Sequence, residues 1–396
     1  MLAVLSLLAA FAALPARADL VADPGVQAMV DAVTRTQLEP MVRELSGEAP
    51  MTVGGQTVAI ASRSSYSGDD IDRVERYVYE HLEACGLDSV VYDEFLAEAG
   101  APPGRNVIGQ IEGGARADEI VILGAHLDDR PWEGRAPGAD DDASGVAATL
   151  LLACAFAGHG FDRTVRFAFW GDEENAPWTC EQFGSAGYAA ACAAAGEDIV
   201  AVVQADAMAF DPPESEAAVA EMNCRADRAD PEGRDRAIAT LWQDAIAAYG
   251  IGEIEPRVIA QGMNWSDHGS FWNAGYPAVM LSAEEWDYWN PNWHTTNDTA
   301  GTLAWPLYVQ VTRSYLATAA HLASIEPETD DSDGDSDDDG DDGRPPAARD
   351  CACGGVGAGP WLPLTFLPVV LRRARRHMPL RTRGNHRRTD LGDEVL

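Results

Sequence analysis

Imidazole and carboxylate side chains follow several short apolar runs in this sequence. His126, Asp128, Glu173, Glu174 and Asp206 lie at or just beyond the ends of three runs. Asp140, Asp141 and Asp142 open the helical stretch after the first of these runs, and a Trp-rich loop leads from a fourth run to His294. Carboxylates gathered in such number would repel one another unless cations offset their charge. Imidazole with carboxylate suits zinc, whereas all-cysteine sites are excluded because no thiolate belongs to the set. Two histidines and several carboxylates exceed the needs of one zinc ion, so we expect a pair of ions about 3.5–4 Å apart that share one carboxylate.

Four apolar runs supply the strands that would bring these side chains together. The runs at 119–126, 164–171, 199–206 and 276–282 are typical of strands buried on both faces. Helical patterns alternate with them, near 143–157, 184–195, 232–249 and 301–323. This alternation predicts an α/β fold with a largely parallel sheet that helices cover on both sides. Ligands of such sheets bind beyond the carboxyl ends of the strands, where the histidines and carboxylates lie.

Each of these residues also has an ordinary explanation. A single Asp at a strand end is usually a cap or part of a turn, and a single His is more often structural than a ligand. Convergence favours chemistry, because both histidines and several carboxylates would leave the same edge of one sheet.

A series of short motifs resembles the pattern of a known family. The motifs are HisLeuAsp (126–128), ProGlyAlaAspAspAspAlaSerGly (137–145), GluGlu (173–174), GlnAlaAsp (204–206), SerAspHis (266–268), AlaGlyTyrProAla (274–278) and HisThrThrAsnAspThr (294–299). Over residues 60–320 the chain resembles the secreted di-zinc aminopeptidases of clan MH, and most of all the bacterial leucyl aminopeptidases. The resemblance implies the zinc exopeptidase fold, a single-domain three-layer α/β/α sandwich with a mostly parallel mixed sheet.

The resemblance also implies a role for each residue of the set. Two zinc ions would be bridged by Asp141 and held by Glu174 and His294 on one side and by His126 and Asp206 on the other. Asp128 would hold the His126 ring through its second nitrogen, and Glu173 would be the general base. The implied activity is that of an exopeptidase acting on peptides with a free N-terminus.

The residues that surround this set have less certain roles. Asp140 and Asp142 flank the bridging residue, and Asp142 or Ser144 is expected to cap the following helix. Asp129 and Glu133 are interpreted as solvated loop charges.

Two further segments have two possible roles each, one in the site and one in the structure. Asp267 and His268 either shape the site or are structural, and the tryptophans of 286–293 either line its entrance or pack in the core.

Residues 175–183 form a longer link than in the leucyl enzymes, which leaves the preferred substrate side chain undecided.

Three other functions are compatible with the sequence. Glutaminyl cyclases share the fold but hold a single zinc. A carboxypeptidase of the same fold would need an Arg for the substrate carboxylate, for which Arg130 and Arg135 are candidates. A non-catalytic surface protein would be expected to lack metal ligands, and all the expected ligand types are present.

The charge of the chain narrows the classes of partner. It has 28 basic residues, none of them Lys, and 64 acidic residues, for a formal net charge of -36. The missing lysines exclude P-loop and Schiff-base chemistry. An acidic surface repels nucleic acid and attracts cationic groups such as a peptide amine. We expect a monomer.

Both ends of the sequence carry signals for export. Residues 1–18 form an apolar run that ends in Ala16-Arg17-Ala18, typical of a signal peptide, with an uncleaved anchor as the alternative. Residues 351–377 hold an apolar run followed by an Arg cluster, which resembles the C-terminal sorting signals of some Gram-negative bacteria; a plain membrane tail is the alternative. We therefore expect an exported protein, extracellular or on the outer cell surface. The predicted segments are a signal peptide at 1–18, a catalytic domain at 19–325, a disordered acidic linker at 326–350, a sorting or anchor segment at 351–377 and a basic tail at 378–396.

Seven cysteines fit an oxidising compartment without forming a disulfide scaffold. Cys154 lies in an Ala/Leu-rich helical stretch and is interpreted as a small buried hydrophobic residue. The pairing of the cysteines is not readable from their positions.

Overall fold

The computed structural model describes most of the first 325 residues. The described ranges are 20–95, 104–130, 134–135, 137–174, 184–213, 217–226, 229–230, 232–283 and 290–325. They belong to the first of two compact units, Met1–Gly340. The predicted signal peptide, acidic linker, sorting segment and basic tail lie outside them, and those segment boundaries stay predictions.

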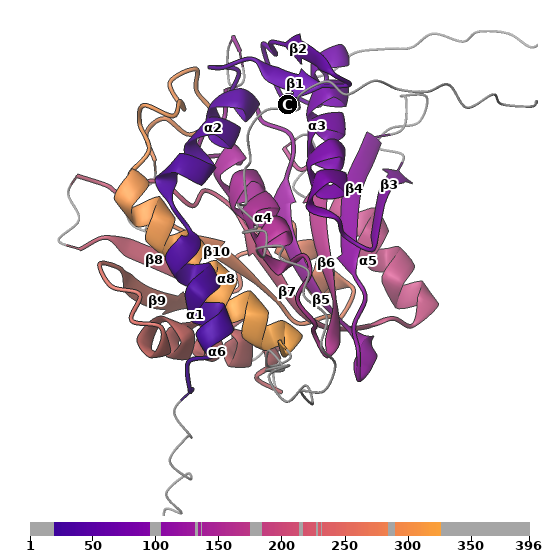
Figure 1. Ribbon diagram of the computed structural model, residues 1–396, viewed down its shortest axis with the longest axis vertical. Coiled ribbons are helices and arrows are strands. Elements are labelled where there is room, and N and C mark those ends of the chain that lie inside the picture. Colours follow the sequence, from indigo (N-terminus) through magenta and orange to yellow (C-terminus); the bar gives the residue numbers. More distant parts are fainter. Residues whose placement is uncertain are drawn as a thin grey trace, which may run out of the picture. The chain divides into compact units, whose positions relative to one another are not determined.

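Among the described residues, eight strands form one mixed sheet in the order β3-β4-β6-β5-β7-β10-β8-β9 (Figure 1). The neighbours β6, β5, β7 and β10 run parallel, whereas β3, β4 and β8 introduce antiparallel pairs. The strands are β3 (Ser89–Phe95), β4 (Gly104–Ile111), β5 (Arg116–His126), β6 (Arg163–Trp170), β7 (Asp198–Ala205), β8 (Val219–Asn223), β9 (Glu255–Ile259) and β10 (Ala278–Ser282). A separate hairpin joins β1 (Met51–Val53) to β2 (Gln56–Val58).

Helices cover both faces of this sheet, as the alternation in the sequence predicts. The larger core joins one face to α1 (Pro24–Ala32), α2 (Arg35–Leu45), α3 (Asp69–Cys85), α4 (Ala143–Phe156), α6 (Arg234–Ala248) and α8 (Trp305–Ala323). The smaller core joins the other face to α5 (Gly184–Ala195) and α7 (His268–Asn273). Successive strand residues alternate between the two, with Val121 and Leu123 in the larger core and Ile122 in the smaller. The expected three-layer α/β/α fold is confirmed.

The central strands end at one edge of the sheet because they run in the same direction. His126 at the end of β5 lies opposite Trp170 at the end of β6. Both strands are buried along their carboxyl halves, so apolar side chains on both faces hold their tips in place. The loops that follow β5, β6 and β7 therefore start side by side.

The segment before the first sheet strand is part of the main core. Val26, Leu38 and Val42 are fully buried there. Asp23 caps α1 by accepting hydrogen bonds from the backbone of Gly25 and Val26, at 2.8 and 3.0 Å. Removal of residues 20–50 would expose this apolar surface. These residues therefore pack as part of the folded domain.

The cysteine interpretation needs a correction. Cys154 is bonded to Cys85 in a disulfide that joins the end of α3 to α4. The sequence separation of 69 residues gave no local signal for this pairing. Cys192 is a buried thiol in the α5 layer.

Within the described part of the chain, none of the helices combines the length and apolarity that crossing a bilayer requires. The predicted sorting or anchor segment lies outside this part.

Candidate metal centre

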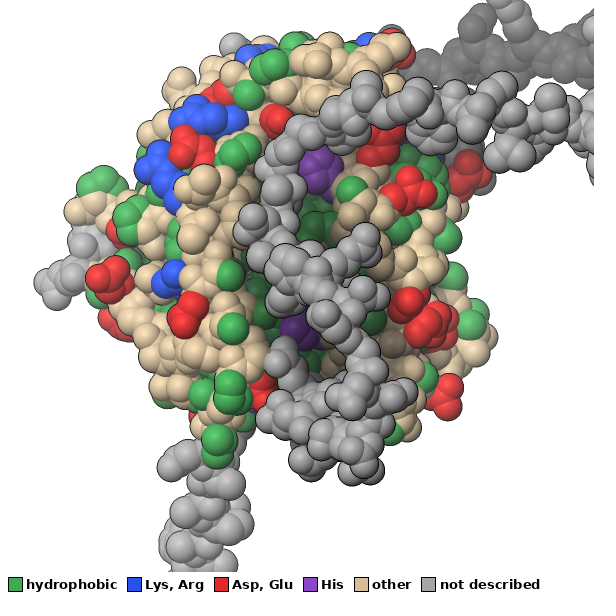
Figure 2. Space-filling model, in the orientation of Figure 1, with side chains coloured by type: hydrophobic (Ala, Val, Ile, Leu, Met, Phe, Trp, Pro, Cys, Tyr) green, Lys and Arg blue, Asp and Glu red, His purple; other side chains and the backbone are tan. Residues whose placement is uncertain are grey.

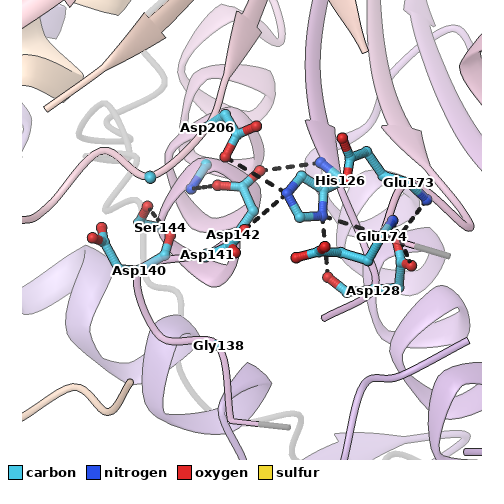
Figure 3. A network of polar contacts seen from close by, with 12 residues as sticks. His126, Asp128, Gly138, Asp140, Asp141, Asp142, Ser144, Glu173, Glu174 and Asp206 are labelled. Atoms are coloured by element: carbon cyan, nitrogen blue, oxygen red, sulfur yellow. Dashed lines mark hydrogen bonds and ion pairs between the residues drawn. The ribbon is translucent and has the colours of Figure 1, made fainter. Parts of the chain in front are cut away.

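The residues singled out in the sequence meet at the carboxyl edge of the parallel strands. His126 ends β5, Glu173 and Glu174 follow β6, and Asp206 follows β7 (Figure 3). His294 comes from the loop between β10 and α8, and Asp141 comes from the loop that leads into α4. All six are buried or nearly so, with Asp206 the most exposed of them.

The Asp141 carboxylate lies between the two histidines. Its Oδ1 is 3.1 Å from His126 Nε2, and its Oδ2 is 3.3 Å from His294 Nε2. His126 Nε2 is also 3.6 Å from Asp206 Oδ1, and His294 Nε2 is 2.7 Å from Glu174 Oε1. Two potential ligand groups, His126 with Asp206 and His294 with Glu174, therefore share Asp141. Within each group the ligand atoms lie within 4.8 Å of one another.

The neighbours of Asp141 have separate structural tasks. Asp142 caps α4 by accepting from the backbone of Gly145 at 2.8 Å, and its other oxygen accepts from the backbone of His126 at 3.1 Å. Asp140 accepts from the backbone of Ala209 and from the Asn290 amide, at 2.8 and 2.9 Å. The expectation of a capping Asp142 is met. Both flanking carboxylates thus connect the Asp141 loop to neighbouring segments.

Asp128 supports the centre in a way that differs from the expectation. The His126 ring Nδ1 lies 3.1 Å from the main-chain oxygen of Asp128, whereas its distance to the Asp128 carboxylate is 3.9 Å. The carboxylate instead accepts hydrogen bonds from the backbone of Glu173 and Glu174, at 3.0 and 3.1 Å, and from the Ser65 hydroxyl at 2.8 Å. The side chain of Asp128 therefore positions the turn that carries the two glutamates, and its carbonyl orients the imidazole.

The buried carboxylates of the cluster shift the pKa values of the groups around them. Burial lowers the pKa of His126, but the nearby carboxylates of Asp206 and Asp141 outweigh it and raise the pKa well above its ordinary value. Burial opposes ionisation of Asp141, yet hydrogen bonds from His126 and His294 bring its pKa below the usual range. Burial raises the pKa of the Glu173 and Glu174 carboxyls well above theirs. Divalent cations would offset the negative charge gathered here.

The residues present fit zinc. The donors are imidazole nitrogens and carboxylate oxygens, the set that zinc accepts. Asp141 Oδ2 is buried, and the partner that faces it is the His294 imidazole at 3.3 Å, so it retains a lone pair for a cation. Burial of the whole group makes an arrangement without a cation unfavourable.

One expectation about the loop charges is wrong. Asp129 is 3 % exposed instead of solvated. Burial raises its pKa to about 7, and the positive charge of Arg63 opposes that rise. Glu133, the other residue interpreted as a solvated charge, lies outside the described residues.

The segment at 266–268 lies beside the cluster. Asp267 is buried and accepts from the Gln204 amide at 3.0 Å. The His268 Nε2 lies 2.7 Å from the Met263 carbonyl oxygen. Burial raises the pKa of Asp267 to about 7 and lowers the pKa of His268 to about 4. Both side chains have protein partners, which fits a structural role at the site wall.

Other predicted wall residues are only partly described. Trp293 stacks on the His294 ring with the ring centroids 3.7 Å apart. Trp286, Trp289 and the insertion at 175–183 lie outside the described residues.

The two arginines considered for carboxylate recognition contact the main chain. Arg130 donates to the Glu174 carbonyl at 3.0 Å, next to the cluster. Arg135 donates to the Ser46 carbonyl at 2.7 Å, at the end of α2.

Sequence reasoning missed residues that hold the Asp141 loop. Asp298 accepts from the backbone of Asp140 at 2.9 Å and from the backbone of Asp141 at 3.1 Å. It stands four residues after His294, within the motif HisThrThrAsnAspThr (294–299). Arg63 binds the carbonyl side of the same loop and gave no signal, because it lies far away in the sequence.

Comparison with known proteins gives a consistent result. The family described as Peptidase family M28 matches residues 106–354. Leucine aminopeptidase 1 of Aspergillus fumigatus is 29% identical over 257 residues, which cover 60% of this chain and 62% of that protein. The chain thus spans less than two thirds of the length of this curated relative.

Solved structures share the fold. The LapA aminopeptidase of Legionella pneumophila has a TM-score of 0.60 and 20% identity, covering 78% of each chain. A glutaminyl cyclase of Macrostomum lignano has the same TM-score and identity, covering 79% of this chain and 97% of that chain. At this identity the likeness bears on the fold alone.

Proposed function

The chain belongs to peptidase family M28, and on this premise we propose that it is a metallo-aminopeptidase that uses two zinc ions to remove N-terminal residues from peptides. The curated relative named leucine aminopeptidase 1 supports this activity. One geometric observation carries the proposal: the two oxygens of Asp141 each face the Nε2 of a different histidine. A single carboxylate shared in this way suits a pair of closely spaced ions.

Each ion would have its own set of protein ligands. His126, Asp206 and one Asp141 oxygen would hold the first, and His294, Glu174 and the other Asp141 oxygen the second. When bound, the two ions would supply Lewis-acid chemistry, which lowers the pKa of water and polarises a scissile carbonyl.

Glu173 is the proposed general base. Its side chain is buried at the cluster, in one potential ligand group with His126 and Glu174. Burial raises the pKa of the Glu173 carboxyl, and the positive charge of bound ions would oppose that rise. The ionised carboxylate would accept the proton of the attacking water and deliver it to the departing amine. Asp128 holds the Glu173 backbone and so fixes the position from which this proton moves.

The proposed substrate is a peptide with a free, positively charged N-terminus. The net charge of -36 would favour its approach. Figure 2 shows acidic side chains spread over the face drawn there, with few basic ones among them. Arg130 and Arg135, considered for a carboxypeptidase, each donate to a main-chain carbonyl, and these contacts do not decide between the two exopeptidase activities. The aminopeptidase proposal is supported by the relative named leucine aminopeptidase 1.

A glutaminyl cyclase is the second candidate, because its fold is shared over nearly the whole of the solved cyclase chain. A single-zinc centre would need only Asp141, Glu174 and His294. It would leave the His126 and Asp206 pair without a metal-binding task, which makes this candidate weaker.

One experiment separates these functions. The protein is incubated with peptides that are free or blocked at either end and with peptides that begin with glutamine, with and without a chelator. Chelator-sensitive release of the N-terminal residue, with two zinc ions per chain by elemental analysis, is the expected result. Release of the C-terminal residue would indicate a carboxypeptidase, pyroglutamate would indicate a cyclase, and inert substrates would indicate a binding protein.

We also propose that the enzyme is exported and attached to the outer cell surface of a Gram-negative bacterium. Support comes from the apolar run at 1–18 and from the apolar and Arg-rich segments at 351–377. Deleting residues 344–396 should release active enzyme into the medium. Unchanged cell fractionation of the truncated protein would contradict surface attachment.

A further inference from the structure

Arg63 is a fully buried cation beside the loop that carries Asp141. Its exposed fraction is 0%, whereas its neighbours Ser62 and Ser64 in the segment after β2 are half-buried. Burying a guanidinium is unfavourable unless its donors are satisfied, so the contacts of this side chain indicate what it does.

The five N–H donors of the guanidinium meet five main-chain carbonyls. The Nε donates to Leu127 at 3.0 Å, and Nη1 donates to Leu45 at 3.2 Å and to Pro137 at 2.8 Å. Nη2 donates to Gly138 at 3.0 Å and to Asp141 at 3.3 Å. One side chain thus connects the end of α2, the segment after β5 and the loop at 137–141.

Three of these acceptors belong to the short loop that ends at Asp141. The loop turns sharply, because Gly138 has a φ of 49° and a Cβ atom there would lie 2.2 Å from the Asp141 carbonyl oxygen. Asp298 binds the N–H groups of Asp140 and Asp141 on the other side. Arg63 and Asp298 therefore hold the peptide frame of Asp141 from opposite directions.

We propose that Arg63 is a positioning residue of the metal centre, which fixes the main chain of 137–141 so that the Asp141 carboxylate spans His126 and His294. This inference rests on the proposed zinc site. A lysine is not equivalent, because its three donors lie on one nitrogen and do not reach acceptors on three segments. A residue that acted on stability alone would change the melting temperature and leave zinc affinity as it is.

The test compares two arginine-to-lysine substitutions. Arg63→Lys is expected to weaken zinc binding by about 10- to 100-fold, the usual effect of removing a group that orients a metal ligand. Both ions should be affected together, because Asp141 is shared. Arg225→Lys is the matched control, since Arg225 donates to Asp235 at 2.7 Å and to the Tyr276 carbonyl at 3.2 Å. Tyr276 precedes β10, at the edge of the sheet opposite the metal centre, so this variant should lose stability and keep its zinc affinity.

The measurements are zinc retention in graded concentrations of chelator and the absorption spectrum of the cobalt-substituted protein. An Arg63→Lys protein with wild-type retention and spectrum would overturn the inference. Wild-type protein without zinc would instead overturn the proposed function, so the two failures are distinguishable.

A second variant covers the case in which Arg63→Lys does not fold. Arg63→Ala is refolded with millimolar guanidinium, which matches the missing group, or with the same concentration of sodium chloride. Recovery of zinc affinity with guanidinium alone is the expected result. A protein that folds in both salts and holds zinc as wild type does would refute the positioning role.

Discussion

Removing the disulfide between Cys85 and Cys154 should destabilise the protein without emptying the metal centre. The bond joins residues 69 apart in the sequence, and loop-closure entropy for a loop of this size amounts to about 4 kcal/mol. The bonded residue of α4 lies near the end of the helix distant from Asp142, whose cap is made at the first turn. We therefore expect the free energy of unfolding to fall by about 2–4 kcal/mol in the Cys85→Ser, Cys154→Ser double variant, with zinc content unchanged.

Urea unfolding followed by fluorescence and circular dichroism measures the difference, with m-values compared to confirm that the same surface is exposed. Cys192→Ser is the matched control, because the Cys192 thiol is buried but forms no disulfide. A loss below about 1 kcal/mol would show that the cross-link does not restrict the unfolded chain as the entropy argument requires. A loss of zinc in the double variant would show that α4 transmits the change to its first turn.

Three further predictions concern the site and its wall. Glu173→Gln should abolish turnover while zinc stays bound, because the amide no longer accepts a proton; zinc loss measured by elemental analysis would give Glu173 a ligand role instead. Asp141→Asn should release both ions on dialysis, since both groups share this carboxylate, whereas retention of one tightly held zinc would show that Asp141 does not bridge two ions. The pKa of His268 is about 4 in the folded protein and about 6.5 in the unfolded chain. As the pH falls below about 6.5, the unfolded chain therefore binds this proton before the folded protein does. The free energy of unfolding should decline by at most about 3 kcal/mol toward pH 4. His268→Gln should flatten that decline in urea titrations at several pH values, and an unchanged slope would contradict the assignment.

The central strands were predictable because their signal is local. The runs that became β5, β6, β7 and β10 are apolar over most of their length, apart from single polar residues such as Arg166 and Gln204, since both faces of the sheet are covered. Strand direction then placed His126 beside the residues after β6 without knowledge of the loops. The edge strand β3 gave no comparable signal, because its side chains are mostly half-buried or exposed.

Residues whose role depends on distant partners were not predictable. Asp129 lies in a strongly charged stretch, which predicts a solvated side chain. In the structure it is buried, because the turn at Gly138 packs against it and the charge of Arg63 lies nearby. Cys154 resembles any small residue of an Ala-rich helix until α3 is placed beside α4. Arg63 donates to five main-chain carbonyls. Every residue has a main-chain carbonyl, so the residue types in the sequence do not identify the partners of Arg63.

The contact between α1 and α8 has a consequence for biosynthesis. Arg313 of α8 donates to the Val33 carbonyl at the end of α1 at 3.1 Å, and Tyr249 links the Asp23 backbone to His321. The larger core is therefore closed only after residues at both extremes of the described chain have met. In the export proposed above, a chain threaded through a translocation channel would lack its complete larger core until α8 had emerged, and it would become active only after passage.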